Sequence, residues 1–180
     1  IITYYWPPSG GAGVQRWLKF VKYLRRFNWE PIVFTVENGE FPVLDFGLIK
    51  EIPDGVEVLK VPVWEPYKMY KLFSGKNKNE GINSGFLSEK KESSLVENLS
   101  KWIRGNLFIP DARKFWIKPA NQFLNQYLQN NPVDVIISSG PPHSTHLIAL
   151  SLKNTFQIPW LSDFRDPWTN IDFYKDLKLT

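Results

Sequence analysis

The sequence predicts an α/β fold, a doubly wound and mainly parallel Rossmann-like sheet flanked by helices. Short, nearly all-apolar runs at 31–36 and 133–138 are typical of strands buried on both faces. Segments with apolar residues at three- and four-residue steps alternate with these runs, as in a parallel sheet built from βαβ units. The 180 residues suit one domain, and 43% hydrophobic with 22% charged residues excludes disorder and collagen-like fibres.

The first part of the chain predicts a β–loop–α–β unit. Pro7-Pro8 stops the first strand, and the glycine-rich stretch 9–13 leads into a helix with an apolar stripe. Asn28 ends that helix. Strands are expected over 1–5, 31–36 and 56–61, and helices over 14–24 and 64–73.

The second part continues the alternation after a polar insertion at 74–94, which we expect to be a surface segment. Lys118-Pro119 begins a clear helix, because proline is well tolerated in a first helical turn. Further helices are expected over 95–104 and 143–156, and strands over 133–138 and 158–162. We interpret 1–180 as a single Rossmann-like domain and as one part of a longer protein.

Composition restricts the chemistry. The chain has no cysteine and two histidines, so thiolate metal sites and cysteine nucleophiles are excluded, and we expect no metal. No apolar run approaches the ~18 residues of a membrane-spanning helix, and no secretory signal is visible. Residues 68–118 hold eleven Lys/Arg against five Asp/Glu, a local excess of +6 that favours a local anionic partner over nucleic acid.

Three loops, 7–13, 139–144 and 163–168, follow the expected core strands. Ligands of open parallel sheets bind beyond the carboxyl ends of the strands, so the fold should bring these loops together. Backbone N–H groups of the glycine loop, at the start of a helix, could hold a phosphate or carboxylate. Arg16 stands where a dinucleotide fingerprint needs its third glycine, and the alternative is a plain strand-to-helix turn.

His143 stands at the start of a helix, where the helix dipole would lower its pKa and favour the neutral imidazole. Such a ring suits a general base or a hydrogen bond to a sugar hydroxyl; the alternative is that His143 or Ser144 merely caps the helix. His146 is expected to be a packed core residue. The run 163–166 (Asp-Phe-Arg-Asp) is either a polar clamp for a ligand or an ion pair that fixes the loop.

Residues 95–118 interleave aromatic side chains with cations. This pattern suits an anionic lipid surface or single-stranded nucleic acid, and the alternative, which we favour, is that the aromatics are core and the cations solvated.

The segments 4–16 (YYWPPSGGAGVQR), 138–144 (SSGPPHS) and 163–168 (DFRDPW) resemble loops of retaining, nucleotide-sugar-dependent glycosyltransferases of the GT-B architecture, the family 4-like group. The resemblance spans nearly the whole chain and implies that it is the amino-terminal, acceptor-side domain. The carboxy-terminal donor-binding domain, with its Glu-x7-Glu motif, would then be absent from this chain, and the chain alone would be inactive.

The resemblance also implies roles for individual residues. His143 would be the catalytic residue near the transferred sugar. The substrate-binding candidates are Gly10, Gly11, Gly13, Arg16, Asp163, Arg165 and Asp166. Gly10, Gly11 and Gly13 would approach the donor diphosphate and the acceptor, and Arg165 and Asp166 would line the acceptor side.

The expected function is therefore half of a bacterial enzyme that transfers a sugar to a glycan or lipid-linked acceptor, in cell-surface polysaccharide or glycolipid synthesis. The enzyme would use a nucleotide sugar and no cofactor, in the cytoplasm or peripherally at the inner face of the plasma membrane, with no nucleic acid as partner. Two alternatives remain. One is a nicotinamide- or flavin-binding Rossmann domain with Glu37 on the ribose hydroxyls, and the other is a non-catalytic membrane- or carbohydrate-binding module.

Overall fold

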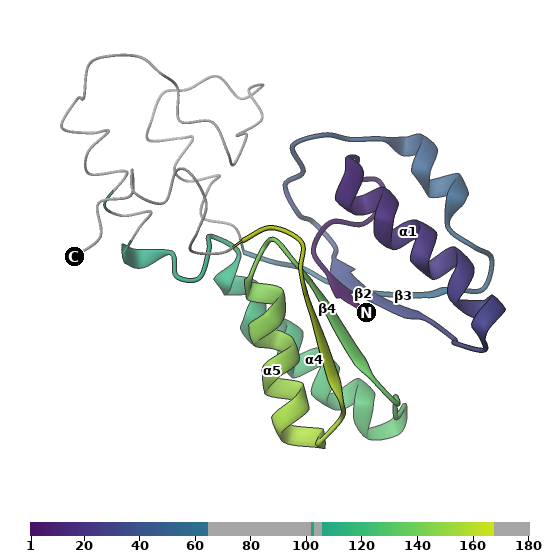
Figure 1. Cartoon of the computed structure of the whole chain (residues 1–180). Coiled ribbons are helices and arrows are strands. Elements are labelled where there is room, and N and C mark those ends of the chain that lie inside the picture. The colour runs from purple at the N-terminus through teal and green to yellow at the C-terminus, as the bar shows by residue number, and fades with distance from the viewer. Residues whose placement is uncertain (65–101, 103–105, 168–180) are drawn as a thin grey trace, which may run out of the picture.

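The computed structural model describes residues 1–64, 102 and 106–167, and it has the predicted fold class (Figure 1). Five parallel strands form one sheet in the order β3-β2-β1-β4-β5. The strands are β1 (Ile2–Thr3), β2 (Ile32–Val36), β3 (Glu57–Val61), β4 (Ile136–Gly140) and β5 (Trp160–Phe164). The all-parallel Rossmann-like sheet is thus confirmed.

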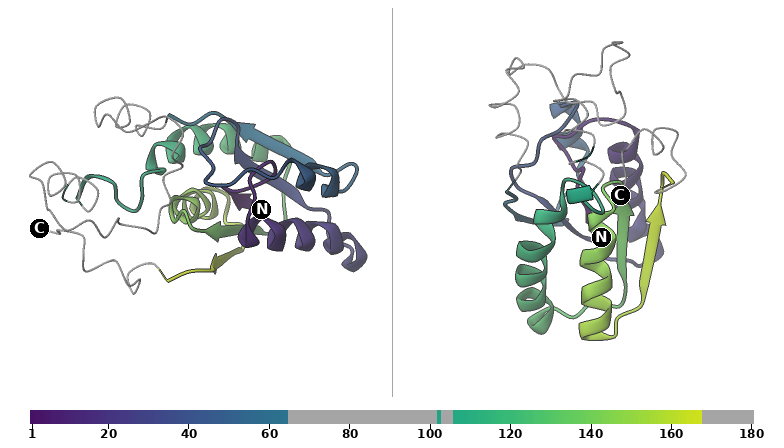
Figure 2. Two further views of the ribbon diagram at one scale, coloured as in Figure 1. Left: turned by 90° about the horizontal axis from the view of Figure 1, so that it is seen from above. Right: turned by 90° about the vertical axis from the view of Figure 1, so that its left-hand side faces the viewer.

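Helices cover both faces of this sheet. Helix α1 packs on one face, and α4 and α5 pack on the other, as two views at right angles agree (Figures 1 and 2). The α-helices are α1 (Ala12–Leu24), α4 (Ile117–Asn130) and α5 (Ser144–Phe156), and the 3-10 helices are η1 (Arg25–Phe27), η2 (Phe46–Glu51) and η3 (Lys114–Trp116).

Helix α1 follows the predicted pattern closely. Its buried residues Val14, Trp17, Leu18 and Val21 recur at steps of three, one and three, which places them on one side of the helix. Asn28 closes η1, directly after α1, with φ of 62°, a left-handed conformation that asparagine tolerates. The predicted end of the helix is therefore confirmed.

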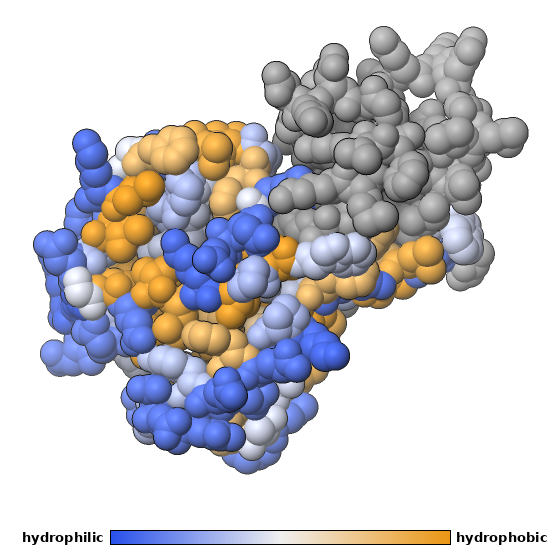
Figure 3. All heavy atoms as spheres, turned by 180° about the vertical axis from the view of Figure 1, so that it is seen from behind, coloured by the Kyte–Doolittle hydropathy of each residue, from blue (hydrophilic) through white to orange (hydrophobic). Residues whose placement is uncertain are grey.

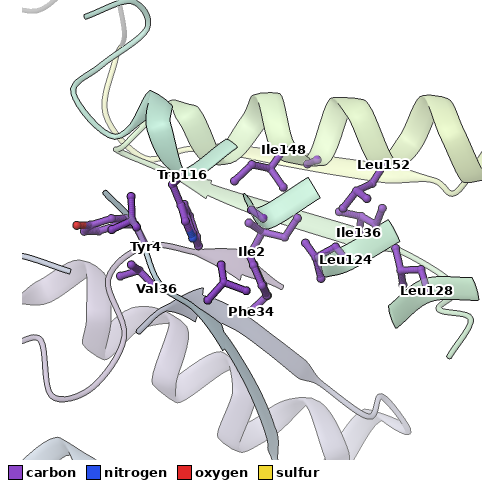
Figure 4. Packing of buried hydrophobic residues seen from close by; sticks show 14 residues of the cluster. Ile2, Tyr4, Phe34, Val36, Trp116, Leu124, Leu128, Ile136, Ile148 and Leu152 are labelled. Atoms are coloured by element: carbon purple, nitrogen blue, oxygen red, sulfur yellow. The ribbon is translucent and has the colours of Figure 1, made fainter. Parts of the chain in front are cut away.

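The α4–α5 side of the sheet holds the larger aromatic core (Figure 4). The fully buried Trp116 stacks on Phe34, with ring centroids 5.4 Å apart, and meets Tyr4 edge-on at 5.6 Å. Trp116 comes from η3, so this ring anchors the chain just before α4 to strands β1 and β2. Truncating such a side chain typically costs about 3–5 kcal/mol.

Apolar side chains also reach the surface, and on the face seen from behind they form patches between hydrophilic ones (Figure 3). On α1 and η1, Phe20 and Phe27 are 50% and 72% exposed. Scattered apolar exposure is normal for a folded domain, and these side chains do not belong to either core cluster.

Some element boundaries differ from those expected. Strands β4 and β5 begin three and two residues later than predicted and end two residues later, because their backbones stay paired up to Gly140 and Phe164. The run from which β4 was predicted ends at Ser138, but backbone hydrogen bonds between strands do not depend on the polarity of the side chains. Strand β1 is shorter than expected, and η2 and η3 were not predicted. The expected helix at 64–73, the helix at 95–104 and the insertion at 74–94 lie, apart from Trp64 and Trp102, outside the described residues.

Candidate functional site

The three loops singled out in the sequence leave the sheet at one rim. Strands β1, β4 and β5 are parallel neighbours, so the segments after their carboxyl ends, 7–13, 139–144 and 163–167, emerge side by side. The predicted convergence is confirmed for these residues. The gap between β1 and β4 is also where the strand order reverses, the position at which open α/β sheets bind ligands.

Asp163 ties these elements together. Its carboxylate accepts hydrogen bonds from Ser139 Oγ at 2.8 Å and from Trp17 Nε1 at 3.3 Å, and it pairs with Arg16. Burial alone would raise the pKa of Asp163, but the hydrogen bonds and the charge of Arg16 outweigh it, so the pKa lies below its usual value. The ionised carboxylate therefore links the ends of β4 and β5 to α1.

Asp163 lies inside strand β5 and not, as expected, in the following loop. The ion-pair interpretation of the 163–166 run is supported, because Arg165 also donates to Asp166, at 2.7 Å from Nη2 and 3.3 Å from Nε. Whether Arg16, Asp163, Arg165 and Asp166 also contact a substrate stays a prediction.

The start of α1 has no cap and carries the positive end of the helix dipole, and the two arginines beside it, Arg16 and Arg165, are each paired with an aspartate. Gly11, the residue before the helix, has φ of 104°, its side-chain position is empty, and α1 has neither a side-chain cap nor an acidic residue in its first turn. A Cβ on Gly13 would overlap the guanidinium of Arg165, so glycine is needed for this close approach. Gly10 donates its N–H to the carbonyl of Val43 at 2.9 Å. Free N–H groups and the helix dipole favour an anion here.

His143 lies directly before α5, and its side chain makes no capping hydrogen bond to the helix. The ring is 9% exposed and stacks on Phe164, with centroids 5.8 Å apart. Burial lowers the pKa of His143, against the opposing charges of Asp111 and Asp166. The expected direction of the shift is confirmed, with burial as its main cause, and the imidazole is neutral at pH 7.

His146 is a buried residue held by a short chain of hydrogen bonds, as predicted for a packed histidine. Trp160 Nε1 donates to Ser138 Oγ at 2.8 Å, and Ser138 Oγ lies 2.8 Å from His146 Nδ1. The ring also stacks on Phe164 at 4.1 Å between centroids. Burial, followed by the charge of His143, lowers the pKa of His146 to about 4.

Gly140 explains how both imidazoles come close to the end of β4. A Cβ on this residue would lie 2.6 Å from His146 Nε2 and 3.2 Å from His143 Nδ1. Any side chain would therefore push the rings away from the strand. The surface at the end of β4 is therefore uncharged, because it consists of the two imidazoles, Phe164 and the backbone of Gly140. It lies beside the start of α1, where the helix dipole is positive.

Asp111 also lies at this rim, although no sequence pattern pointed to it. Its carboxylate accepts hydrogen bonds from the Ser144 N–H at 2.8 Å and from Ser144 Oγ at 2.7 Å, and so caps α5. The sequence suggested His143 or Ser144 as the cap of α5, and neither residue caps the helix. His143 makes no capping hydrogen bond, and the Ser144 hydroxyl donates to Asp111. The two partners are 33 residues apart, beyond the reach of any local pattern.

The aromatic–basic stretch 95–118 divides between core and surface in the part that the structure describes. Trp116 is fully buried, whereas Trp102 and Ile109 are 38% and 62% exposed. A shallow hollow of about 710 Å³ lies here, lined by apolar side chains, by Lys114 and Lys118, and by the amides of Asn121, Gln122 and Asn125. Trp116 is thus core, as favoured, and the membrane interpretation of the stretch stays a prediction.

Searches of protein-family models, curated proteins and solved structures found no match to this chain. Over residues 1–64, 102 and 106–167, no helix has the length and apolarity needed to cross a membrane. The same residues contain no cluster of three or more side chains suited to a metal ion. The geometry of the rim therefore has to carry the functional argument.

Proposed function

We propose that this chain is the acceptor-side domain of a retaining, nucleotide-sugar-dependent glycosyltransferase of the GT-B architecture. The enzyme would transfer a sugar to a glycan or lipid-linked acceptor, in cell-surface polysaccharide or glycolipid synthesis. A carboxy-terminal donor-binding domain would complete the cleft. The proposed place of action is the cytoplasm or the inner face of the plasma membrane.

The observation that carries this proposal is the linked rim. Asp163 joins Ser139 at the end of β4 to Arg16 on α1, and Arg165 lies against Gly13. Three segments that resemble glycosyltransferase loops, distant in sequence, therefore form one continuous surface at the switch point of the sheet. Any parallel sheet with this strand order would bring the three segments to the same rim. The hydrogen bonds that join them directly depend on the particular residues of this chain.

The two sides of the rim suit two parts of a sugar-transfer reaction. The open start of α1, with Arg165 beside it, suits the diphosphate of a nucleotide sugar. On the other side, the neutral imidazole of His143 can accept a hydrogen bond from a sugar hydroxyl. A charged and an uncharged subsite side by side match a substrate with a phosphate next to a polyhydroxylated ring.

The test is transfer of labelled sugar by the whole enzyme, with a panel of nucleotide sugars as donors and membrane glycolipids and glycans as acceptors. We expect the wild type to transfer and His143→Ala to lose about 100-fold or more in kcat/KM, the usual contribution of a catalytic acid or base. The chain alone should not transfer. Normal turnover by His143→Ala would remove His143 from the mechanism, and no transfer with any donor would contradict the proposal.

Glu37→Ala is the matched control, because this side chain would matter only to a nicotinamide- or flavin-binding domain. It follows the end of β2, where its backbone N–H donates to the Val61 carbonyl, a contact that the substitution keeps. We expect unchanged transfer by the variant and no binding of NADH to the wild type in a fluorescence titration. NADH binding that Glu37→Ala abolishes would favour the dinucleotide interpretation instead.

A further inference from the structure

The capping carboxylate of Asp111 comes from outside the three loops that were expected to form the site. It reaches the start of α5 from the segment before η3, and both of its oxygens are engaged there. Oδ2 accepts from the Ser144 N–H, and Oδ1 accepts from Ser144 Oγ and from the Arg113 N–H at 2.8 Å. The first turn of α5 is thus fixed by a residue that is 33 positions away.

This cap determines what His143 can do. The imidazole of His143 makes no capping bond and is turned toward Phe164 and Gly140, while the carboxylate of Asp111 caps the helix through Ser144. In the described part of the chain, the groups near it include Asp111, Asp166 after β5, and His146 one turn along α5. Asp111 and Asp166 oppose the effect of burial on its pKa, and Asp111 has the larger effect.

The cap also distinguishes α5 from α1. Both helices begin at the same rim, and each start would attract an anion. At α5 a carboxylate of the protein already occupies this position, whereas α1 has no cap. An anionic group of a ligand would meet the charge of Asp111 at α5, whereas at α1 it would meet the guanidinium of Arg165, which is also paired with Asp166.

We propose that Asp111 is a positioning residue with a second role in specificity. It holds the first turn of α5 and with it the ring of His143 at the rim, and it keeps the phosphate of a substrate away from α5 so that this group binds at α1. The role in specificity deepens the proposed function, since it assigns the uncharged hydroxyl-bearing part of the substrate to the His143 side. The positioning of His143 does not depend on which reaction the enzyme performs.

Two variants of Asp111 and one control test this proposal. Asp111→Asn keeps the size and one oxygen acceptor but removes the charge, and Asp111→Ala removes the cap altogether. Asp45→Asn is the control, because Asp45 caps η2 through Gly47 N at 2.9 Å and lies beside Gly10, on the α1 side of the rim and not at the start of α5. If Asp111→Ala does not fold, Asp111→Asn carries the whole test.

The first measurement is the pH titration of the two imidazoles by NMR. Asp111→Asn should move the midpoints of both His143 and His146 to lower pH, because the charge of Asp111 favours both protonated rings. Asp45→Asn should leave both unchanged. Unchanged midpoints in Asp111→Asn would overturn the proposed link between Asp111 and the histidines.

The second measurement is a titration with inorganic phosphate, followed at the backbone amides. In the wild type we expect saturable shifts at 11–14 and none at Ser144, whereas the Asp111 variants should show a new shift at Ser144. Equal shifts at Ser144 in wild type and variants would overturn the specificity role.

The third measurement is the activity of the whole enzyme. Asp111→Asn should lower kcat at least about tenfold, through misplacement of His143. Normal kcat in this variant would overturn the positioning role. The two NMR measurements test the roles of Asp111 independently of whether the enzyme transfers a sugar.

Discussion

Helices α1 and α5 start at the same rim of the sheet but present opposite surroundings to a ligand. The start of α1 is a glycine loop with no side-chain cap, next to Arg165, and the start of α5 is closed by Asp111 and lined by two neutral imidazoles. The topology makes the two positions equivalent, so the difference comes from individual side chains. Under the proposed function, one helix start would receive the anionic part of a ligand and the other an uncharged part.

The largest predicted effect concerns the α5 side and pH. The pKa of His146 is about 4 in the folded chain and about 6.5 when unfolded, so the unfolded state binds more protons between these values. Stability should therefore fall as the pH drops from 6.5 to 4, by on the order of 3 kcal/mol. Burial of His143 acts in the same direction. Above pH 6.5 neither ring makes the free energy of unfolding depend on pH.

Urea denaturation at several pH values checks this prediction. His146→Asn, whose amide oxygen can replace Nδ1 and accept from Ser138, should lose most of this dependence of stability on pH and keep the smaller part due to His143. An equally steep slope in this variant would mean that the α5 side does not hold a buried neutral imidazole.

The next effect concerns the link between the two sides. Asp163→Ala removes the acceptor for Ser139, Trp17 and Arg16, and we expect a loss of about 2 kcal/mol at pH 7. Because the folded pKa of Asp163 is lowered, its contribution is present above the unfolded pKa, near 3.9, and is lost as the pH falls through the folded value. The difference between wild type and variant should therefore shrink in acid.

Asp166→Ala is the control for the Asp163 prediction. Its carboxylate is also paired with an arginine, but its side chain is 48% exposed, so the stability change should stay within about 0.5 kcal/mol. Equal losses in the two variants, measured by chemical denaturation, would contradict the view that Asp163 is the link.

The smallest effects concern two glycines at the start of α1. Gly11→Ala should cost about 1–2 kcal/mol, because its φ of 104° is strained for any side chain although the space is empty. Gly13→Ala should cost little or stabilise slightly, because only the mobile end of Arg165 has to move and alanine is the better helix former. The Gly13 variant should nevertheless weaken phosphate binding.

Thermal unfolding and phosphate titration of both variants separate strain from binding. If Gly13→Ala binds phosphate as well as the wild type, Arg165 is not part of the α1 subsite. If Gly11→Ala is as stable as the wild type, the backbone at the start of α1 is not the strained turn described here.

Much of this arrangement could be predicted from the sequence. The apolar period of α1, the buried run of β2 and the proline-led start of α4 are local signals, and so is the alternation that implies a parallel sheet. The convergence of the three loops followed from topology alone. The glycines, the two histidines and the 163–166 run were visible because their residue types are unusual at strand ends.

The contacts that separate α1 from α5 could not be predicted. The cap from Asp111 to Ser144 and the bond from Ser139 to Asp163 join residues far apart in sequence, and the choice between partners depends on the packed structure. The ends of β4 and β5 were missed for a related reason, since pairing continues two residues beyond the runs from which the strands were predicted. Local pattern predicts the elements, and only packing decides which polar groups meet.

The most direct test of one shared ligand surface is a titration of the chain with pyrophosphate, a probe for the diphosphate of a nucleotide sugar, followed by NMR. We expect saturable shifts of the backbone amides of 11–14 and of Arg165 Nε, together with a shift of the His143 ring, all with one dissociation constant. Shifts confined to other surfaces, or different dissociation constants for the three groups, would contradict it.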